Sequence, residues 1–291
     1  MAATTQVHPW HDFGPVPAER LWAAALTVSD QAEAAGLLVP LQTQLLDLDH
    51  EPFVIRRLLG ATPKHLRAAG PRPNPFLPWE PGLQVNRLGQ SHIVLLNKYP
   101  VQRGHLLVIS ADWKPQSGWL ETADWQAVAA VSQDTSGLWF FNSCAAAGAS
   151  QPHRHLQLLP RKAGDTVCPL EPLYVDMLKA KPADASRQWR FALSRRHAPG
   201  EASELRALYH QHCLELGLGS PQQAPQPLAP YNLLFSDHWL LTVRRTREHS
   251  AGFSVNALGF AGYLLATDDS DLGWLRQHGP WCLLKQVAAA P

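Results

Sequence analysis

Residues 141–160, FNSCAAAGASQPHRHLQLLP, end in a short segment that places polar side chains at every second position. The run 153–159 is rich in Leu and stops at a proline, which suits a buried strand better than a helix. Side chains of a strand alternate between its two faces, so His153, His155 and Gln157 are predicted to share one face. Buried imidazole and amide groups each need a hydrogen-bonding partner. This face is therefore predicted to line a site.

The loop before this strand consists of small residues. Gly148, Ala149, Ser150 and Gln151 leave their backbone N–H groups accessible to an anion, as in phosphate-binding turns. A nucleophilic ring nitrogen beside a phosphate-binding loop is typical of phosphoryl or nucleotidyl transfer. We therefore expect this loop and the strand to form one site.

The H-x-H pair has two other interpretations, a metal site and a pair of exposed strand residues. A metal site needs a third protein ligand, and no Cys or carboxylate lies nearby in the sequence. The four cysteines are scattered without a C-x-x-C pair, so the usual zinc motifs are missing. Two exposed strand histidines are the other alternative, but the loop and the proline stop favour a site. No protein-bound metal is expected.

Composition limits the classes of partner. The chain has 291 residues, of which 45% are hydrophobic, so it can bury a sizeable core. Its 25 basic and 24 acidic residues give a net charge of +1, which favours neither nucleic acid nor a membrane surface as partner. We see no secretory signal and no apolar run of ~20 residues that would span a bilayer. A cytoplasmic protein is the expectation.

The remaining elements predict an α+β fold, because strands and helices are segregated along the chain. Helices are expected over residues 18–36 and 120–134 and, with breaks near Pro182 and Pro199, over 171–216. Strands are expected over residues 91–96, 105–110, 138–141, 153–159, 231–235 and 238–243. The proline-rich stretch 71–81 is expected to be an extended connector, and 220–230 a linker that divides the chain into domains 1–219 and 220–291. A basic turn with Arg244, Arg245 and Arg247 is either solvated or binds distal phosphates.

The segment GASQPHRHLQ resembles the signature of the diadenosine tetraphosphate phosphorylases, or ATP adenylyltransferases. This branch of the histidine-triad superfamily has H-x-H-x-Q where the hydrolases have a third histidine. Other segments resemble the family in the same order, from about residue 50 to 267: NPFLP at 74–78, LLNKYPV at 95–101, GHLL at 104–107, FFNS at 140–143, YNLL at 231–234 and NALGFAG at 256–262.

The resemblance implies a histidine-triad-like antiparallel sheet with flanking helices, in which C-terminal strands complete the substrate cleft. It also implies phosphorolysis of diadenosine 5',5'''-P1,P4-tetraphosphate by inorganic phosphate to ATP and ADP, through an adenylylated histidine. Mg²⁺ would come with the polyphosphate. The nucleophile would be His155, Gln157 would hydrogen-bond a phosphate oxygen, and His153 would support the nucleophile.

Further substrate contacts are implied by the resemblance alone. They are Arg56 (with Arg57 and Lys64 as alternatives), Asn97, Asn142, Gly148, Ala149, Ser150, Gln151, Gln157, Asn256, Ala257, Leu258, Tyr263 and Thr267. The family often has Met and Lys where this chain has Tyr263 and Thr267, and a Thr removes a phosphate contact that a Lys would make.

The glutamine also has a physical reason. A third histidine can move protons for an attacking water, whereas the amide of Gln157 can only hydrogen-bond. Inorganic phosphate is already an anionic nucleophile at pH 7, so Gln157 favours transfer to phosphate. A dinucleoside polyphosphate hydrolase, another nucleotidyltransferase of the superfamily such as a sugar-nucleotide uridylyltransferase, and an inactive nucleotide-binding module stay open as alternatives.

Overall fold

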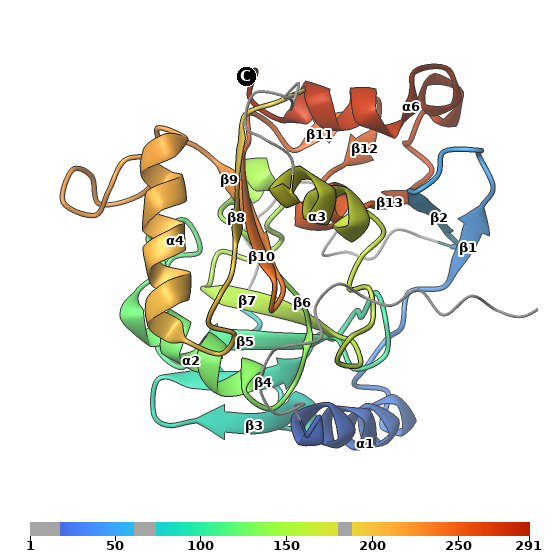
Figure 1. Cartoon of the computed structure of the whole chain (residues 1–291). Coiled ribbons are helices and arrows are strands. Elements are labelled where there is room, and N and C mark those ends of the chain that lie inside the picture. Colours follow the sequence, from blue (N-terminus) through green and yellow to red (C-terminus); the bar gives the residue numbers. More distant parts are fainter. Residues whose placement is uncertain (1–17, 61–73, 180–187) are drawn as a thin grey trace, which may run out of the picture.

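An eight-stranded antiparallel sheet runs through the protein in the computed structural model, which describes residues 18–60, 74–179 and 188–291. Its strand order is β3-β4-β5-β7-β6-β9-β10-β8, so the H-x-H-x-Q strand lies near the middle (Figure 1). The strands are β3 (Gln84–Leu88), β4 (His92–Leu96), β5 (Leu106–Ser110), β6 (Gly137–Asn142), β7 (His155–Pro160), β8 (Phe191–Arg195), β9 (Tyr231–Phe235) and β10 (Trp239–Arg244).

Helices cover both faces of this sheet. One face packs against α1 (Arg20–Ala34), α2 (Thr122–Ser132) and α4 (Ala202–Glu215), and the other lies toward α3 (Glu171–Lys179), α5 (Ala257–Ala261) and α6 (Leu272–Val287). Strand β7 shows why the sheet needs both layers. Leu156 and Leu158 belong to the core beneath α1, α2 and α4, whereas Leu159 belongs to the core on the opposite face. A strand that is buried on both faces reads as a nearly continuous apolar run.

A second, three-stranded sheet combines two strands from the N-terminal part of the chain with one strand from the C-terminal part. It contains β1 (Thr43–Leu46), β2 (Val54–Leu58) and β13 (Tyr263–Ala266), in the order β1-β2-β13. Strands β2 and β13 run parallel, with Val54 opposite Tyr263. Short elements complete the fold: η2 (Pro81–Leu83), η3 (Ala145–Ala147), β11 (His249–Ser250) and β12 (Phe253–Ser254).

The predicted α+β fold is confirmed, and so are the expected strands and the helices near residues 18–36 and 120–134. Two details were wrong. The described part of the 71–81 stretch forms a turn followed by the start of η2, so it is not an extended connector. The 171–216 region contains β8, which was predicted as helix. Five residues carry little periodicity, and it is pairing with β10 that makes them a strand.

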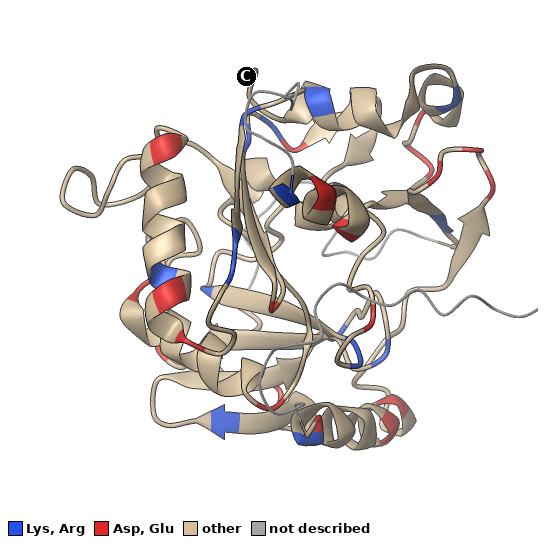
Figure 2. Cartoon of the chain, viewed as in Figure 1, with Lys and Arg blue, Asp and Glu red and all other residues tan. Residues whose placement is uncertain are grey.

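The predicted division at residue 219 stays a prediction about domain organisation. Strand β8 precedes this point in the sequence and pairs with β10, which follows it, so both segments contribute to one sheet. Lys and Arg residues are interspersed with Asp and Glu along the described ribbon (Figure 2). Among the described residues, no helix has the length and apolarity to cross a bilayer.

We expect Leu158→Ala to lower the free energy of unfolding by about 2–5 kcal/mol, because it empties a fully buried position between β7 and the helices. Chemical denaturation followed by tryptophan fluorescence measures the change. Leu45→Ala is the matched control, since Leu45 lies in edge strand β1 and is 58% exposed, and its effect should stay within about 0.5 kcal/mol. Equal losses in the two variants would contradict the assignment of the core.

Candidate active site

The side chain of His155 is held in one tautomer by the backbone. It is the first residue of β7, is only 3% exposed, and its Nδ1 lies 2.8 Å from the carbonyl oxygen of His153. A carbonyl can only accept, so Nδ1 carries the proton and Nε2 keeps its lone pair. Burial lowers the pKa of His155 to about 4. At neutral pH the residue therefore presents an unprotonated nitrogen.

His153 lies just before β7 and shares the face of His155, as predicted, because Phe76 contacts both rings. The N–H of Phe76 donates to Asn74 Oδ1 at 3.0 Å, which turns the Asn74 amide nitrogen toward His153 Nδ1, also at 3.0 Å. His153 Nε2 then donates to the carbonyl of Ser110 at 2.8 Å. Burial lowers the pKa of His153. Both ring nitrogens of His153 are therefore engaged, and its supporting role stays a prediction.

Gln157 contacts His105, a residue for which the sequence analysis proposed no role. Gln157 sits between Leu107 of β5 and Phe140 of β6 and is 9% exposed. Its Oε1 lies 3.0 Å from His105 Nε2. Burial lowers the pKa of His105 to about 3, so the imidazole is neutral. The GHLL segment at 104–107 drew attention to this region. The local sequence does not reveal the partner of His105, because Gln157 lies 52 positions further along the chain.

Gln116 fixes the start of β7 and was also missed. Its Oε1 accepts the N–H of His155 at 2.8 Å, and its Nε2 donates to the carbonyls of Asn142 at 2.7 Å and His155 at 3.2 Å. One buried amide thus joins the end of β6 to the start of β7. Nothing in the local sequence distinguishes Gln116 from a surface glutamine.

The small-residue loop packs closely on the C-terminal part of the chain. Gly148 has φ +86°, and a Cβ there would lie 2.6 Å from the Cβ of Asn256, so only glycine fits without a shift. The N–H groups of Gly148 and Ala149 donate to carbonyls within the turn. Of the four predicted anion-binding amides, those of Ser150 and Gln151 make no such turn bond, and their role stays a prediction.

Arg245 organises this region from within the core. It is 1% exposed, and it donates to the side chain of Asn232 and to the carbonyl of Val255. Asn232 in turn donates to Asn142 Oδ1 at 2.8 Å, which also accepts the N–H of Ala257 at 2.9 Å. Burial lowers the pKa of Arg245 to about 10, which still leaves it charged at pH 7. Both expectations for Arg245, a solvated turn or a phosphate contact, are therefore wrong.

The opposite face of the H-x-H-x-Q segment is anchored by a buried ion pair. Arg154, between the two histidines, lies 2.8 Å from Asp124 of α2, which also accepts a hydrogen bond from His92 at 3.0 Å. Burial opposes ionisation of Asp124, but the hydrogen bond from His92 and the charge of Arg154 outweigh it, so its pKa is lowered. This pair fixes the strand relative to α2.

The other predicted contacts fall into two groups. One group lies close to the start of β7, as the hydrogen bonds and close approaches described above show: Asn142, Gly148 and Asn256–Leu258. The other group, Arg56, Tyr263 and Thr267, lies on or beside the three-stranded sheet, where Arg56 donates to Thr43 and the N–H of Thr267 donates to Ser270. Tyr263 accepts from Arg161 at 3.4 Å, just beyond β7. Lys64 lies outside the described residues. These contacts stay predictions.

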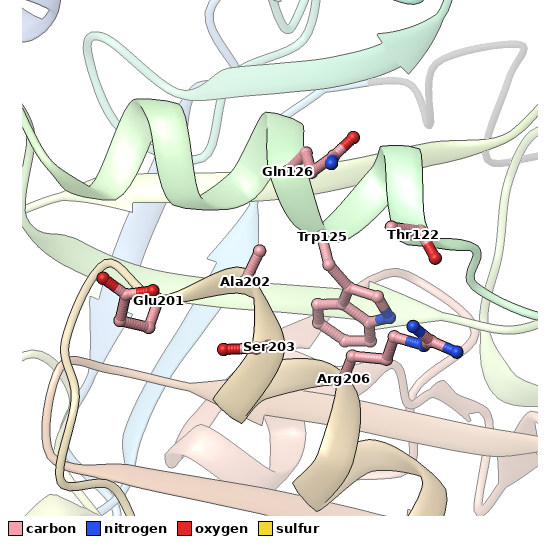
Figure 3. Close-up of a pocket in the computed structure, with 7 residues that line it drawn as sticks. All are labelled: Thr122, Trp125, Gln126, Glu201, Ala202, Ser203 and Arg206. Atoms are coloured by element: carbon pink, nitrogen blue, oxygen red, sulfur yellow. The ribbon is translucent and has the colours of Figure 1, made fainter.

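A surface pocket lies between α2 and α4, on the face of the sheet that α1, α2 and α4 cover. Trp125 and Arg206 are among the residues that line it (Figure 3). It contains no group resembling the histidine site. Among the residues that the structure describes, no three His, Cys, Asp or Glu side chains gather as metal ligands would.

Comparison with known families gives two matches that together span most of the chain. Residues 14–176 match the Ap4A phosphorylase N-terminal domain, and residues 169–290 match the ATP adenylyltransferase C-terminal domain. The first match alone covers more than half of the chain.

Two curated proteins of Saccharomyces cerevisiae are similar in sequence. Diadenosine 5',5'''-P1,P4-tetraphosphate phosphorylase 2 is 25% identical over 205 residues, and Protein APA1 is 26% identical over 201 residues. Each alignment covers 62% of this chain and 63% of the relative, so the chain is matched over less than two thirds of these proteins.

Solved structures show the same fold over nearly the full length. Yeast Ap4A phosphorylase Apa2 in complex with AMP superposes with a TM-score of 0.69 at 20% identity, and its complex with Ap4A superposes with 0.68 at 18% identity. Both cover 94% of this chain and 98% of the other. At this identity the match establishes the fold, which confirms the predicted histidine-triad-like architecture.

We expect the ¹⁵N shifts of the His155 ring to report a neutral Nδ1–H tautomer throughout the neutral range, with protonation near pH 4. Because this pKa lies below the ordinary value of 6.5, the unfolded chain takes up the proton first. The contribution of neutral His155 to stability is therefore present above pH 6.5 and is lost as the pH falls toward 4. His155→Asn assigns the resonances. An Nε2–H tautomer would contradict the assigned geometry.

Proposed function

The chain belongs to the Ap4A phosphorylase family of nucleotidyltransferases, and from this premise we propose that it splits diadenosine 5',5'''-P1,P4-tetraphosphate with inorganic phosphate. The products are ATP and ADP. The observation that carries the proposal is the neutral His155, whose Nδ1–H is bound by the carbonyl of His153 while Nε2 stays available.

In the first step, His155 Nε2 attacks the α-phosphorus of the dinucleotide. A nitrogen–phosphorus bond forms, and the bond from phosphorus to the bridging oxygen breaks, so ATP leaves. The ring becomes cationic as it accepts the adenylyl group. The carbonyl of His153, 2.8 Å from Nδ1, stabilises this charge without any proton transfer.

In the second step, an oxygen of inorganic phosphate attacks the same phosphorus. The phosphorus–nitrogen bond breaks, ADP forms, and His155 returns to its neutral state. The amide of Gln157 donates to a non-bridging oxygen of the transferred phosphoryl group in both steps. Two successive displacements explain why one nucleophile suffices for both halves of the reaction.

The surroundings of His155 favour phosphate over water as acceptor. Water would need a general base, and the two neighbouring histidines have no free ring nitrogen. His153 is hydrogen-bonded to Asn74 and Ser110. His105 is hydrogen-bonded to Gln157 and Asn97. Neither has a spare lone pair. This arrangement argues against the hydrolase alternative, and the complete H-x-H-x-Q set argues against an inactive nucleotide-binding module.

A divalent cation is expected to come with the substrate. The described residues do not offer a cluster of metal-binding side chains, so the polyphosphate oxygens and water would hold Mg²⁺. We further expect a cytoplasmic enzyme whose partners are the dinucleotide, ATP, ADP and phosphate, with no nucleic-acid or membrane partner.

Product formation should depend strongly on inorganic phosphate. With diadenosine tetraphosphate as substrate, ADP and ATP should appear together when phosphate is added, and chromatography of the nucleotides measures both. Full turnover to AMP and ATP in phosphate-free buffer would instead establish a hydrolase.

His155→Asn should abolish covalent labelling of the protein by adenine-labelled substrate in the absence of phosphate. His153→Ala should leave a reduced rate, because it removes only a supporting ring. Gln157→Ala should lower the rate by about 10²–10³, the cost of one hydrogen bond directed at the transition state. Acid should release the label from the wild-type protein as AMP. The control is His249→Asn, a change at an exposed position, and labelled His155→Asn protein would show that the nucleophile is another residue.

A further inference from the structure

Behind Gln157, a chain of polar groups leads back to the hairpin between β4 and β5. The N–H of Tyr99 donates to Asn97 Oδ1 at 3.0 Å. The Asn97 amide nitrogen lies 3.3 Å from His105 Nδ1, and His105 Nε2 lies 3.0 Å from Gln157 Oε1. His105 packs on Phe140, with 5.8 Å between ring centroids, and is 2% exposed.

Each hydrogen bond in this chain can point in only one direction. A backbone N–H only donates, so Asn97 must turn its oxygen to Tyr99 and its NH₂ to His105. An NH₂ group also only donates, so His105 Nδ1 must be the unprotonated nitrogen. A neutral imidazole then carries its proton on Nε2, and that proton is donated to Gln157 Oε1.

The consequence is that the oxygen of the Gln157 amide is occupied and its NH₂ group is left for the substrate. The two ends of an amide are nearly equal in size, so packing alone barely distinguishes them. A phosphoryl oxygen is an anionic acceptor and is stabilised only by the NH₂ end. With the amide reversed, a carbonyl oxygen would face the phosphoryl oxygen and repel it.

We propose that His105, held by Asn97, is a positioning residue that fixes which end of the Gln157 amide faces the transferred phosphoryl group. This inference rests on the proposed function, and it concerns the orientation of a hydrogen-bond donor rather than the nucleophile. It also gives Asn97 a role within the protein, which leaves its second amide hydrogen for the ribose contact expected there.

The test compares His105→Phe with Gln157→Ala and the double variant, using α-phosphorothioate diastereomers of the dinucleotide as substrates. A donor directed at one non-bridging oxygen makes the wild type discriminate between the diastereomers. His105→Phe should slow phosphorolysis roughly tenfold or more and shift the diastereomer ratio toward that of Gln157→Ala. The double variant should be no slower than Gln157→Ala alone, because both changes remove one interaction.

His212→Phe is the matched control. His212 is also a buried histidine with both ring nitrogens bound, to Ser194 and Thr242, but it lies in α4 on the other face of the sheet. It should lose stability and keep the wild-type diastereomer ratio. If His105→Phe behaves in the same way, His105 is merely structural and the inference is wrong.

Two further measurements keep the inference testable if His105→Phe does not fold. In the wild type, the ¹⁵N shifts of His105 should show an Nε2–H tautomer, and an Nδ1–H tautomer overturns the inference.

In Asn97→Asp, the new carboxylate can only accept a hydrogen bond, so a neutral His105 ring carries its proton on Nδ1. Nε2 then donates to Gln157 only while the His105 ring is protonated on both nitrogens. His155 is the titratable group that acts on His105 from β7, and it is neutral above pH 4. Phosphorolysis by Asn97→Asp should therefore decline as the pH rises, and a wild-type pH profile contradicts the inference.

Failure of the proposed function can be distinguished from failure of this inference. Covalent labelling of His155 is measured on the same proteins. A wild type that never takes up label refutes the function, whereas a labelled wild type with an unchanged diastereomer ratio in His105→Phe refutes only the orienting role.

Discussion

The polar groups of the site are buried, so each donor needs an acceptor and each acceptor needs a donor. This requirement fixes the orientation of the side chains around His155. Its Nδ1 proton has one acceptor, the carbonyl of the residue two positions earlier. The same logic applies twice more. Asn74 and Asn97 each accept a backbone N–H two residues ahead and then donate to a histidine. Backbone donors, whose direction cannot change, thereby set the tautomers of His153 and His105.

Rigid anchors on both faces of the sheet hold these groups in place. On one face, the ion pair between Arg154 and Asp124 holds the H-x-H-x-Q segment against α2. At the end of β6, Asn142 and Asn232 connect the sheet to the buried Arg245 and to the start of α5. Buried charges are costly unless they are fully paired, so these anchors contribute more to geometry than to stability. They explain how residues far apart in the sequence stay aligned.

Two buried histidines of the site are uncharged at neutral pH. Burial lowers the pKa of His155 to about 4 and that of His105 to about 3, so both rings are neutral at pH 7, where inorganic phosphate is an anion. Such a site suits a reaction whose acceptor is already charged. Yeast Ap4A phosphorylase Apa2 shares this fold at 18–20% identity, so the arrangement of the sheet is kept although most residues differ.

Local patterns in the chain were enough to predict the local features. Alternation placed His153, His155 and Gln157 on one face, since the side-chain period of a strand is two, and apolar runs with proline and glycine stops located most strands. Those are properties of neighbouring residues. Folding was needed to bring His105 to Gln157 across β5 and β7, Gln116 to the backbone of His155, and Arg245 into the core. It also made β8 a strand, because its partner β10 lies more than forty residues away. Strand pairing and burial join distant residues, and no local pattern records which ones they will be.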